Sequence, residues 1–170
     1  MDIEIKLLEH QRKFLESNKP RVLLLGGRAS GKSYIASIAA AINLLQGKRI
    51  IVLAQTFAAL QRNIFAEITA RLDEWKVEYH YNSTGMVIKI GKGICYGYSY
   101  ENIEALRGLT EVSVCIADEI ALAPNPDVLF AALSPVMRGK DIKPKMFAMT
   151  TPRGGSAWNE LFKNDKSWDI

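Results

Sequence analysis

The chain has 170 residues, a length that suits one domain with a substantial core. Hydrophobic residues make up 48% of it and charged residues 24%, which excludes a disordered chain, and the net charge of +4 permits a nucleic-acid partner without requiring one. No apolar run approaches the roughly 20 residues that span a bilayer, and the charged amino-terminus lacks a signal-peptide core, so we expect a cytosolic protein without a membrane partner.

Apolar runs of strand length alternate with helical segments along the chain. The expected elements are a helix at 4–17, a strand at 21–25, helices at 33–45 and 57–75 around a strand at 50–54, short β runs at 77–81, 86–90 and 94–98, a helical turn at 101–106, a strand at 112–117, a helix at 127–136, a strand at 146–149 and a helix at 157–163. Continuously apolar strands joined by helices predict a parallel sheet covered on both faces, and the three short runs predict an antiparallel insert at its edge. Cys95 and Cys115 lie alone in strand-like segments, so we expect buried thiols.

A glycine-rich segment lies between the first strand and the second helix. Its residues are Gly26-Gly27-Arg28-Ala29-Ser30-Gly31-Lys32-Ser33, which match the phosphate-binding Walker A pattern in full. Glycines let backbone N–H groups surround a phosphate, Lys32 can reach the β- and γ-phosphates, and Ser33 offers a hydroxyl to Mg²⁺. A glycine-rich turn with a lysine can arise by chance, but this one has the strand and helix that the motif requires. We therefore predict binding of ATP or GTP with Mg²⁺.

The strand at 112–117 ends in a pair of acidic residues. Asp118 is the candidate Mg²⁺ ligand of a Walker B motif, and Glu119 is the candidate general base that orients the attacking water. We expect the end of this strand to lie beside the strand that precedes the glycines, where ligands gather in parallel sheets. An acidic pair can also be a solvated strand end, but together with a complete Walker A motif it predicts hydrolysis. A glutamate directly after the aspartate argues against a Ras-like GTPase.

Several segments, in their order and spacing, resemble the large terminase subunits of tailed bacteriophages, the ATPase motors that package DNA into capsids. They are residues 8–11, 26–33, 54–60, 107–109, 116–119 and 150–152. The resemblance implies a three-layer α/β P-loop NTPase fold of the RecA-like, additional-strand, catalytic-glutamate class, with a mostly parallel central sheet and a small antiparallel insert.

The resemblance also implies roles that spacing alone does not show. Gln11 is similar to an adenine-reading glutamine, which would favour ATP over GTP, and Arg28 is similar to a P-loop arginine that contacts the γ-phosphate. Thr150 and Thr151 lie where the family has its coupling motif, and Arg107 lies where related motors have an arginine that reaches a neighbouring subunit. Each has a simpler alternative: a polar helix residue for Gln11, a solvated loop residue for Arg28, a strand exit for the threonines, and a salt bridge to Glu104 for Arg107.

The implied function is ATP hydrolysis that drives double-stranded DNA into a capsid, in the cytoplasm of the host cell. The implied partners are double-stranded DNA, a portal protein, a small terminase subunit and further copies of the chain in a ring. We expect residues 1–170 to form a single ATPase domain without the nuclease domain of whole large terminases. Two alternatives stay open: a superfamily 2 helicase-like or DNA-repair ATPase, and a non-catalytic nucleotide-binding switch.

Overall fold

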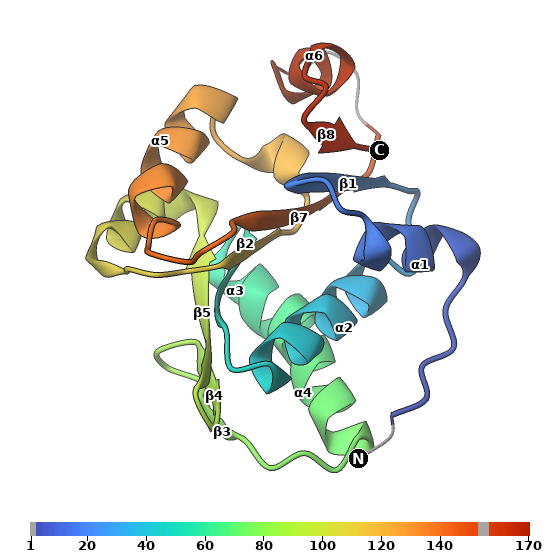
Figure 1. Cartoon of the computed structure of the whole chain (residues 1–170), viewed down its shortest axis with the longest axis vertical. Helices are drawn as coiled ribbons and strands as arrows, with labels where there is room; N and C mark the ends of the chain where they lie inside the picture. The colour runs from blue at the N-terminus through green and yellow to red at the C-terminus, as the bar shows by residue number, and fades with distance from the viewer. Residues whose placement is uncertain (1–2, 153–156) are drawn as a thin grey trace.

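The computed structural model describes residues 3–152 and 157–170. In this part of the chain, a sheet of eight strands crosses the middle of the molecule (Figure 1). The helices and strands, in chain order, are α1 Glu9–Glu16, β1 Arg21–Leu25, α2 Lys32–Leu45, β2 Arg49–Ala54, α3 Phe57–Ala59, the π-helix η1 Leu60–Phe65, α4 Ala66–Glu74, β3 His80–Asn82, β4 Val87–Ile90, β5 Gly93–Ser99, the 3₁₀ helix η2 Tyr100–Gly108, β6 Val114–Ala117, the 3₁₀ helix η3 Ile120–Leu122, α5 Pro126–Val136, β7 Lys145–Thr150, α6 Ala157–Asn164 and β8 Trp168–Asp169.

The sheet has the strand order β3-β4-β5-β2-β6-β7-β1-β8. Its strands pair in parallel except at β3–β4 and β4–β5, which are antiparallel. The predicted mostly parallel sheet with an antiparallel insert at one edge is therefore confirmed. The insert is also joined more closely to the sheet than expected, because its last strand, β5, pairs in parallel with β2 along the full length of β2.

One expectation about neighbouring strands is wrong. The strand that ends in the acidic pair, β6, does not pair with the strand before the glycines, β1, because β7 lies between them and pairs with both. This inserted strand is the additional strand that the predicted fold class requires. The carboxyl ends of β1, β7 and β6 still lie at one edge of the sheet, because the three strands are parallel.

Helices cover both faces of the sheet, as the apolar strands require. Along β2, Ile50 and Val52 belong to a core shared with α2, η1 and α4, whereas Ile51 and Leu53 belong to a second core shared with η2, α5 and α6. All four side chains are fully buried. The alternation of side chains along a strand thus places consecutive apolar residues in two different cores, which produces the three layers. Cys95 and Cys115 are buried free thiols, as predicted.

Local sequence signals explain several helix ends. Helix α2 begins after Gly31, whose φ of 79° suits glycine, and the chain leaves it at Gly47, with φ 75°. The hydroxyl of Thr56 accepts a hydrogen bond from the Ala59 N–H and caps α3, and the Asn125 side chain caps α5 by accepting from the Asp127 N–H. These caps set where the helices beside the carboxyl ends of the strands begin.

Several elements differ from the expectation. The first helix covers only Glu9–Glu16, although a helix was expected over 4–17. The helical segment after β2 is interrupted by the π-helix Leu60–Phe65. The two-residue strand β8, Trp168–Asp169, was not predicted and pairs with β1.

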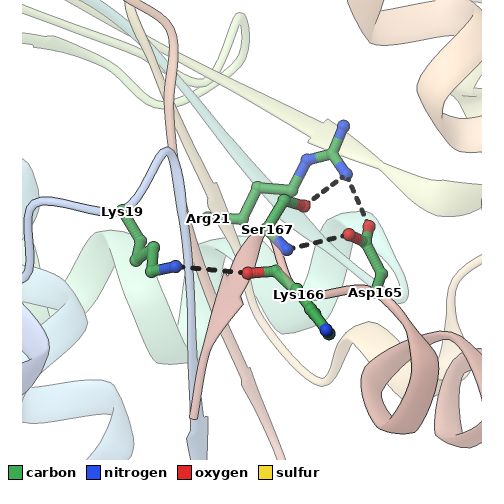
Figure 2. A network of polar contacts seen from close by, with 5 residues as sticks. All are labelled: Lys19, Arg21, Asp165, Lys166 and Ser167. Atoms are coloured by element: carbon green, nitrogen blue, oxygen red, sulfur yellow. Dashed lines mark hydrogen bonds and ion pairs between the residues drawn. The ribbon is translucent and has the colours of Figure 1, made fainter.

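Side-chain contacts hold the β8 region against the start of β1. Arg21 donates hydrogen bonds to the Asp165 carboxylate and the Ser167 hydroxyl, and the Lys19 ammonium donates to the Lys166 carbonyl (Figure 2). The Arg21 guanidinium also stacks over the Phe130 ring at 4.4 Å from its centroid. These contacts lie at the amino end of β1, so they brace the strand from the side opposite the glycine-rich loop.

The approach of β5 to α2 gives a test of the sheet's packing. A methyl group at Gly93 would lie 2.2 Å from the Leu44 carbonyl oxygen, a backbone atom that cannot move aside independently. We expect Gly93→Ala to lower the free energy of unfolding by about 1–3 kcal/mol. Gly108→Ala is the matched control, because nothing lies within 4 Å of a methyl group there, and its effect should stay below about 0.5 kcal/mol. Urea unfolding of both variants measures the difference, and equal stabilities would contradict this packing.

Candidate active site

The glycine-rich loop and the acidic pair meet in one open hollow of about 450 Å³ at the carboxyl ends of the strands. Its lining combines cationic, hydroxyl-bearing and carboxylate side chains, from residues 28–33 with Tyr34, Asn63, Glu67, Asp118, Glu119 and Thr151. The sequence placed the loop and the acidic pair 85 residues apart, from Ser33 to Asp118. The fold brings them together because β1 and β6 end at the same edge of the sheet.

The loop has the backbone that a phosphate cradle needs. Gly31 has a φ of 79° and Ala29 a φ of 59°, so the chain turns through left-handed conformations before α2 begins. A methyl group at Gly26 would lie 2.4 Å from the Ser30 hydroxyl oxygen, which only a glycine avoids. The amino-terminus of α2, with its free N–H groups and positive dipole end, faces the hollow.

Lys32 lies inside the loop rather than in solvent. Its side chain is buried, with 8% of the residue exposed, and its ammonium donates to the carbonyl oxygens of Gly26 and Gly27 at 2.7 Å each. The charge is thus held close to where phosphates would lie. An anion with stronger acceptor oxygens can take over these two hydrogen bonds.

Asp118 is a buried carboxylate at the end of β6. Only 9% of the residue is exposed, and its backbone N–H donates to the Leu53 carbonyl at 2.8 Å. Burial and the neighbouring Glu119 charge together raise the pKa of Asp118 to about 6, against the opposing effects of a hydrogen bond from the Glu119 backbone and of the Lys32 charge. Lys32 offsets only part of the cost of burying the negative charge of Asp118. A bound cation would stabilise the ionised form of this carboxylate.

Glu119 is held by the two predicted coupling residues. Its carboxylate accepts hydrogen bonds from the Thr150 hydroxyl at 3.2 Å, the Thr151 N–H at 3.0 Å and the Thr151 hydroxyl at 2.9 Å. Burial alone would raise the pKa of Glu119, but the hydrogen bonds from Thr151 and Thr150 outweigh it and lower the pKa. The carboxylate is therefore ionised and oriented. Sequence reasoning placed these residues in one site but did not predict that they touch.

The two remaining residues of the predicted nucleotide site lie at its margins. Gln11 is buried in α1, where its side-chain oxygen accepts from the Leu8 N–H at 3.0 Å, and a methyl group at Gly31 would lie 2.6 Å from its amide nitrogen. It therefore touches the loop but does not line the hollow. Arg28 is exposed and does line the hollow. Their roles toward adenine and the γ-phosphate stay predictions.

Arg107 does not lie in the hollow of its own chain. Its side chain is 80% exposed on η2 and forms an ion pair with Glu104 at 2.5 Å, the simpler alternative named above. An exposed ion pair contributes little to stability. The side chain is therefore available to another molecule, and its action on a neighbouring subunit stays a prediction.

Three residues that line the hollow were not predicted, because they belong to none of the sequence motifs. Tyr34 follows the Walker A serine, whereas Asn63 and Glu67 come from η1 and α4. A polar face at spacing 63, 67 and 71 on the helix after β2 is visible in the sequence, but it looks like any solvated helix face. Only the packing of that helix beside α2 shows that the face points into the hollow.

Among the described residues, hollows of about 500, 600 and 630 Å³ are larger than this one. The two largest both include Lys145 at the amino end of β7, away from the carboxyl ends of the strands. None of the three contains a residue of the predicted site. Size therefore does not identify the active site; the convergence of a phosphate loop, an acidic pair and two threonines does.

Comparison with known sequences agrees with this arrangement. The family described as terminase large subunit, T4-like-virus type, N-terminal, matches residues 23–167. The chain belongs to this terminase large-subunit family. It is the ATPase domain of a phage DNA-packaging large terminase, an ATP hydrolase, and the recognition made from the sequence is confirmed. No curated protein sequence matches the chain.

Solved structures show the same fold. The large terminase ATPase domain of a Thermus phage is 24% identical, with a TM-score of 0.76 over 92% of this chain and 69% of that one. The large terminase of a thermophilic bacteriophage in complex with ADP is 16% identical, with a TM-score of 0.65 over 84% of this chain and 38% of that one. The N-terminal domain of the DNA-packaging ATPase of bacteriophage phi29 is 15% identical, with a TM-score of 0.67 over 89% and 84%. This terminase domain thus spans less than half of the ADP-bound relative.

Within the described residues of the terminase domain, none of the helices combines the length and apolar character needed to cross a membrane.

The hydrogen bonds between Thr151 and Glu119 give a test of the site. Thr151→Val removes the hydroxyl donor at nearly constant volume and keeps the N–H donor. We expect kcat for ATP to fall about tenfold, because a hydrogen bond to a charged group is lost, while the Kd for ATP stays within about twofold. Thr151→Ser keeps the hydroxyl and should retain the wild-type rate. A Thr151→Val enzyme with unchanged kcat would show that this contact does not orient Glu119.

Proposed function

We propose that this terminase domain hydrolyses ATP with Mg²⁺ and that the large subunit uses the reaction to drive double-stranded DNA into a capsid. The observation that carries the proposal is the single hollow in which Lys32, Ser33, Asp118 and Glu119 converge. These are the residue types that phosphoryl transfer to water requires: a phosphate cradle, oxygen ligands for the cation and a base for the water.

The donors in the hollow fit a magnesium ion. The Ser33 hydroxyl and the Asp118 carboxylate are oxygen ligands, which Mg²⁺ prefers, and Asp118 is a buried carboxylate that lacks full charge compensation. Bound there, the cation would neutralise charge on the β- and γ-phosphates. The relative that was solved in complex with ADP supports binding of a nucleotide.

The chain's own residues supply the remaining steps. The loop N–H groups and Lys32 bind the phosphates, and Arg28 contacts the γ-phosphate from the exposed side of the loop. Glu119 accepts a proton from the attacking water. The oxygen of that water bonds to the γ-phosphorus, and the bond between the γ-phosphorus and the bridging oxygen of ADP breaks. Gln11 binds adenine from α1, which selects ATP over GTP.

The threonines connect hydrolysis to the rest of the motor. Thr150 is the last residue of β7 and Thr151 follows it, so any movement of the Glu119 carboxylate acts directly on the end of a central strand. We assign Thr150 and Thr151 the coupling role on this contact. In this proposal the strand end passes the state of the γ-phosphate to the surfaces that hold DNA.

The proposed partners follow from the family. They are double-stranded DNA, the portal protein, the small terminase subunit and other copies of the large subunit in a ring. Arg107 would act on a neighbouring copy in that ring, since it is exposed and outside its own hollow. Such an arginine can raise the hydrolysis rate by about 10³- to 10⁵-fold. The protein would act in the cytoplasm of the infected host cell.

Replacement of the candidate base tests hydrolysis directly. We expect Glu119→Gln to bind ATP normally and to lose about 10²- to 10⁴-fold in kcat, since the amide cannot accept the proton. Binding is measured by titration with ATP and turnover by release of inorganic phosphate. Glu101→Gln makes the same chemical change at an exposed position and should leave both unchanged. Equal turnover in the Glu119→Gln variant and the wild type would show that Glu119 is not the general base. Such a result would favour a non-catalytic nucleotide-binding switch.

Mixing two inactive variants tests the role of Arg107. Arg107→Ala keeps Glu119, and Glu119→Gln keeps Arg107, so a ring that contains both has some interfaces with an intact base and an intact arginine. We expect the mixture to hydrolyse ATP faster than the sum of the separate variants, and the wild-type rate per molecule to rise with concentration. Arg62→Ala, also exposed, is the control and should behave as wild type. A mixture whose rate equals the sum of its components would show that Arg107 does not act between subunits.

The DNA-packaging part of the proposal needs the whole large subunit. A large subunit with Glu119→Gln should fail to fill capsids with DNA, whereas one with Glu101→Gln should fill them. Unwinding of DNA by the large subunit, without filling of capsids, would instead support a helicase.

A further inference from the structure

Glu67 is a carboxylate in the hollow that the proposed reaction does not use. It lies on α4 and is half-buried, whereas Asn63, four residues earlier on η1, is exposed at the same hollow. Residues four apart lie on the same side of a helix. One polar face of the helix after β2 therefore forms a wall of the active site.

Packing against α2 fixes the direction of this face. Arg71, one turn beyond Glu67, places its guanidinium over the Tyr34 ring at 5.0 Å from the centroid and forms an ion pair with Glu74. Tyr34 directly follows Ser33 in the first turn of α2, and α4 packs along α2 (Figure 1). Arg71 thus anchors the helix that carries Glu67, and Glu67 lies one turn nearer to the hollow, which the predicted cation ligand Ser33 also lines.

The π-helix contributes to the same arrangement. Its wider turns shift the helical register between β2 and α4, while Leu60, Ile64 and Phe65 remain buried in the core. Such segments occur frequently at functional sites, where they redirect side chains. Here the segment ends at Phe65, directly before the turn that presents Glu67.

The charge of Glu67 has no partner among the residues that the structure describes. Among the described residues, its carboxylate forms neither an ion pair nor a hydrogen bond with another side chain or with the backbone. The hollow contains two cationic side chains, Arg28 and Lys32, and three carboxylates. A carboxylate in a site for ATP repels the phosphates, and no described cationic side chain forms an ion pair with Glu67, so a bound cation would offset this repulsion.

We propose that Glu67 is a positioning residue for the magnesium ion, acting through a water on the ion. The proposal rests on the proposed Mg²⁺-dependent hydrolysis. Within the described residues, no three His, Cys, Asp or Glu side chains are close enough to hold a metal together, so Glu67 is not a direct ligand with Asp118 and Glu119. Mg²⁺ keeps several waters when nucleotides bind, and carboxylates that accept hydrogen bonds from such waters strengthen metal binding.

The test measures how strongly Mg²⁺ improves nucleotide affinity. A fluorescent, non-hydrolysable ATP analogue is titrated into the protein with Mg²⁺ and again with a chelator, and the ratio of the two Kd values gives the coupling. The variants are Glu67→Gln, Glu67→Asp and the control Glu78→Gln, which removes the same charge at an exposed position outside the hollow. Thermal unfolding verifies that each variant is folded.

We expect Glu67→Gln to lower the coupling ratio about tenfold, since loss of an outer-shell partner typically costs this much metal affinity. The affinity of the Glu67→Gln variant for the analogue without Mg²⁺ should stay equal or increase, because the negative charge that repels the phosphates has been removed. Glu67→Asp should also lower the ratio, since the shortened side chain keeps the charge but not the reach. Glu78→Gln should match the wild type.

Two results would overturn the role of Glu67. If Glu67→Gln changes both Kd values by the same factor, Glu67 only packs the wall of the site. If Glu67→Asp retains the wild-type ratio while Glu67→Gln lowers it, the charge acts through its field and not through a positioned water. A wild-type protein that shows no Mg²⁺ coupling at all would instead contradict the proposed Mg²⁺-dependent reaction itself.

Discussion

The pairing of β7 with β1 on one side and β6 on the other is the constraint on which the site depends. In this register Leu25, the last residue before the glycine-rich loop, lies opposite Thr150, and Ala117, the last residue before the acidic pair, lies opposite Ala148. Two residues further along, Glu119 reaches the level of Thr150. Backbone hydrogen bonds between these three strands therefore set the spacing of the loop, the threonines and the base, although β1 and β6 do not pair with each other.

The strained backbone of Glu119 is a consequence of that spacing. Its φ of 45° and ψ of 53° are left-handed, which costs a residue other than glycine of order 1–3 kcal/mol. The cost is offset locally. The Tyr100 hydroxyl donates to the Asp118 carbonyl at 2.8 Å, the Leu122 N–H donates to the Glu119 carbonyl, and the threonines hold the carboxylate. The turn brings the Glu119 carboxylate to Thr150 and Thr151 at the end of β7.

The sequence predicted the parts of this site better than their arrangement. The Walker A loop, the acidic pair and the central strands were found because each has a continuous apolar run or a fixed motif. The expectation that β6 ends beside β1 was wrong, since strand order depends on long-range pairing and leaves no mark in local periodicity; only the fold class implied by the resemblance includes an additional strand. The π-helix was missed because Leu60, Ile64 and Phe65 also fit an α-helix. Strand β8 is too short for its pattern to be recognised, and Glu67 belongs to no motif.

Hydrogen bonds within the glycine-rich loop fix the position of Lys32. Its ammonium is already satisfied by the Gly26 and Gly27 carbonyls, so a phosphate must replace both hydrogen bonds rather than meet a free charge. In the proposed mechanism this exchange keeps Lys32 in place, and Arg28 is the other cationic side chain among the described residues that line the hollow. Charge that develops on the γ-phosphate during transfer would be stabilised by these two side chains and, in the proposed ring, by Arg107 of a neighbouring copy, which is exposed and lies outside the hollow of its own chain.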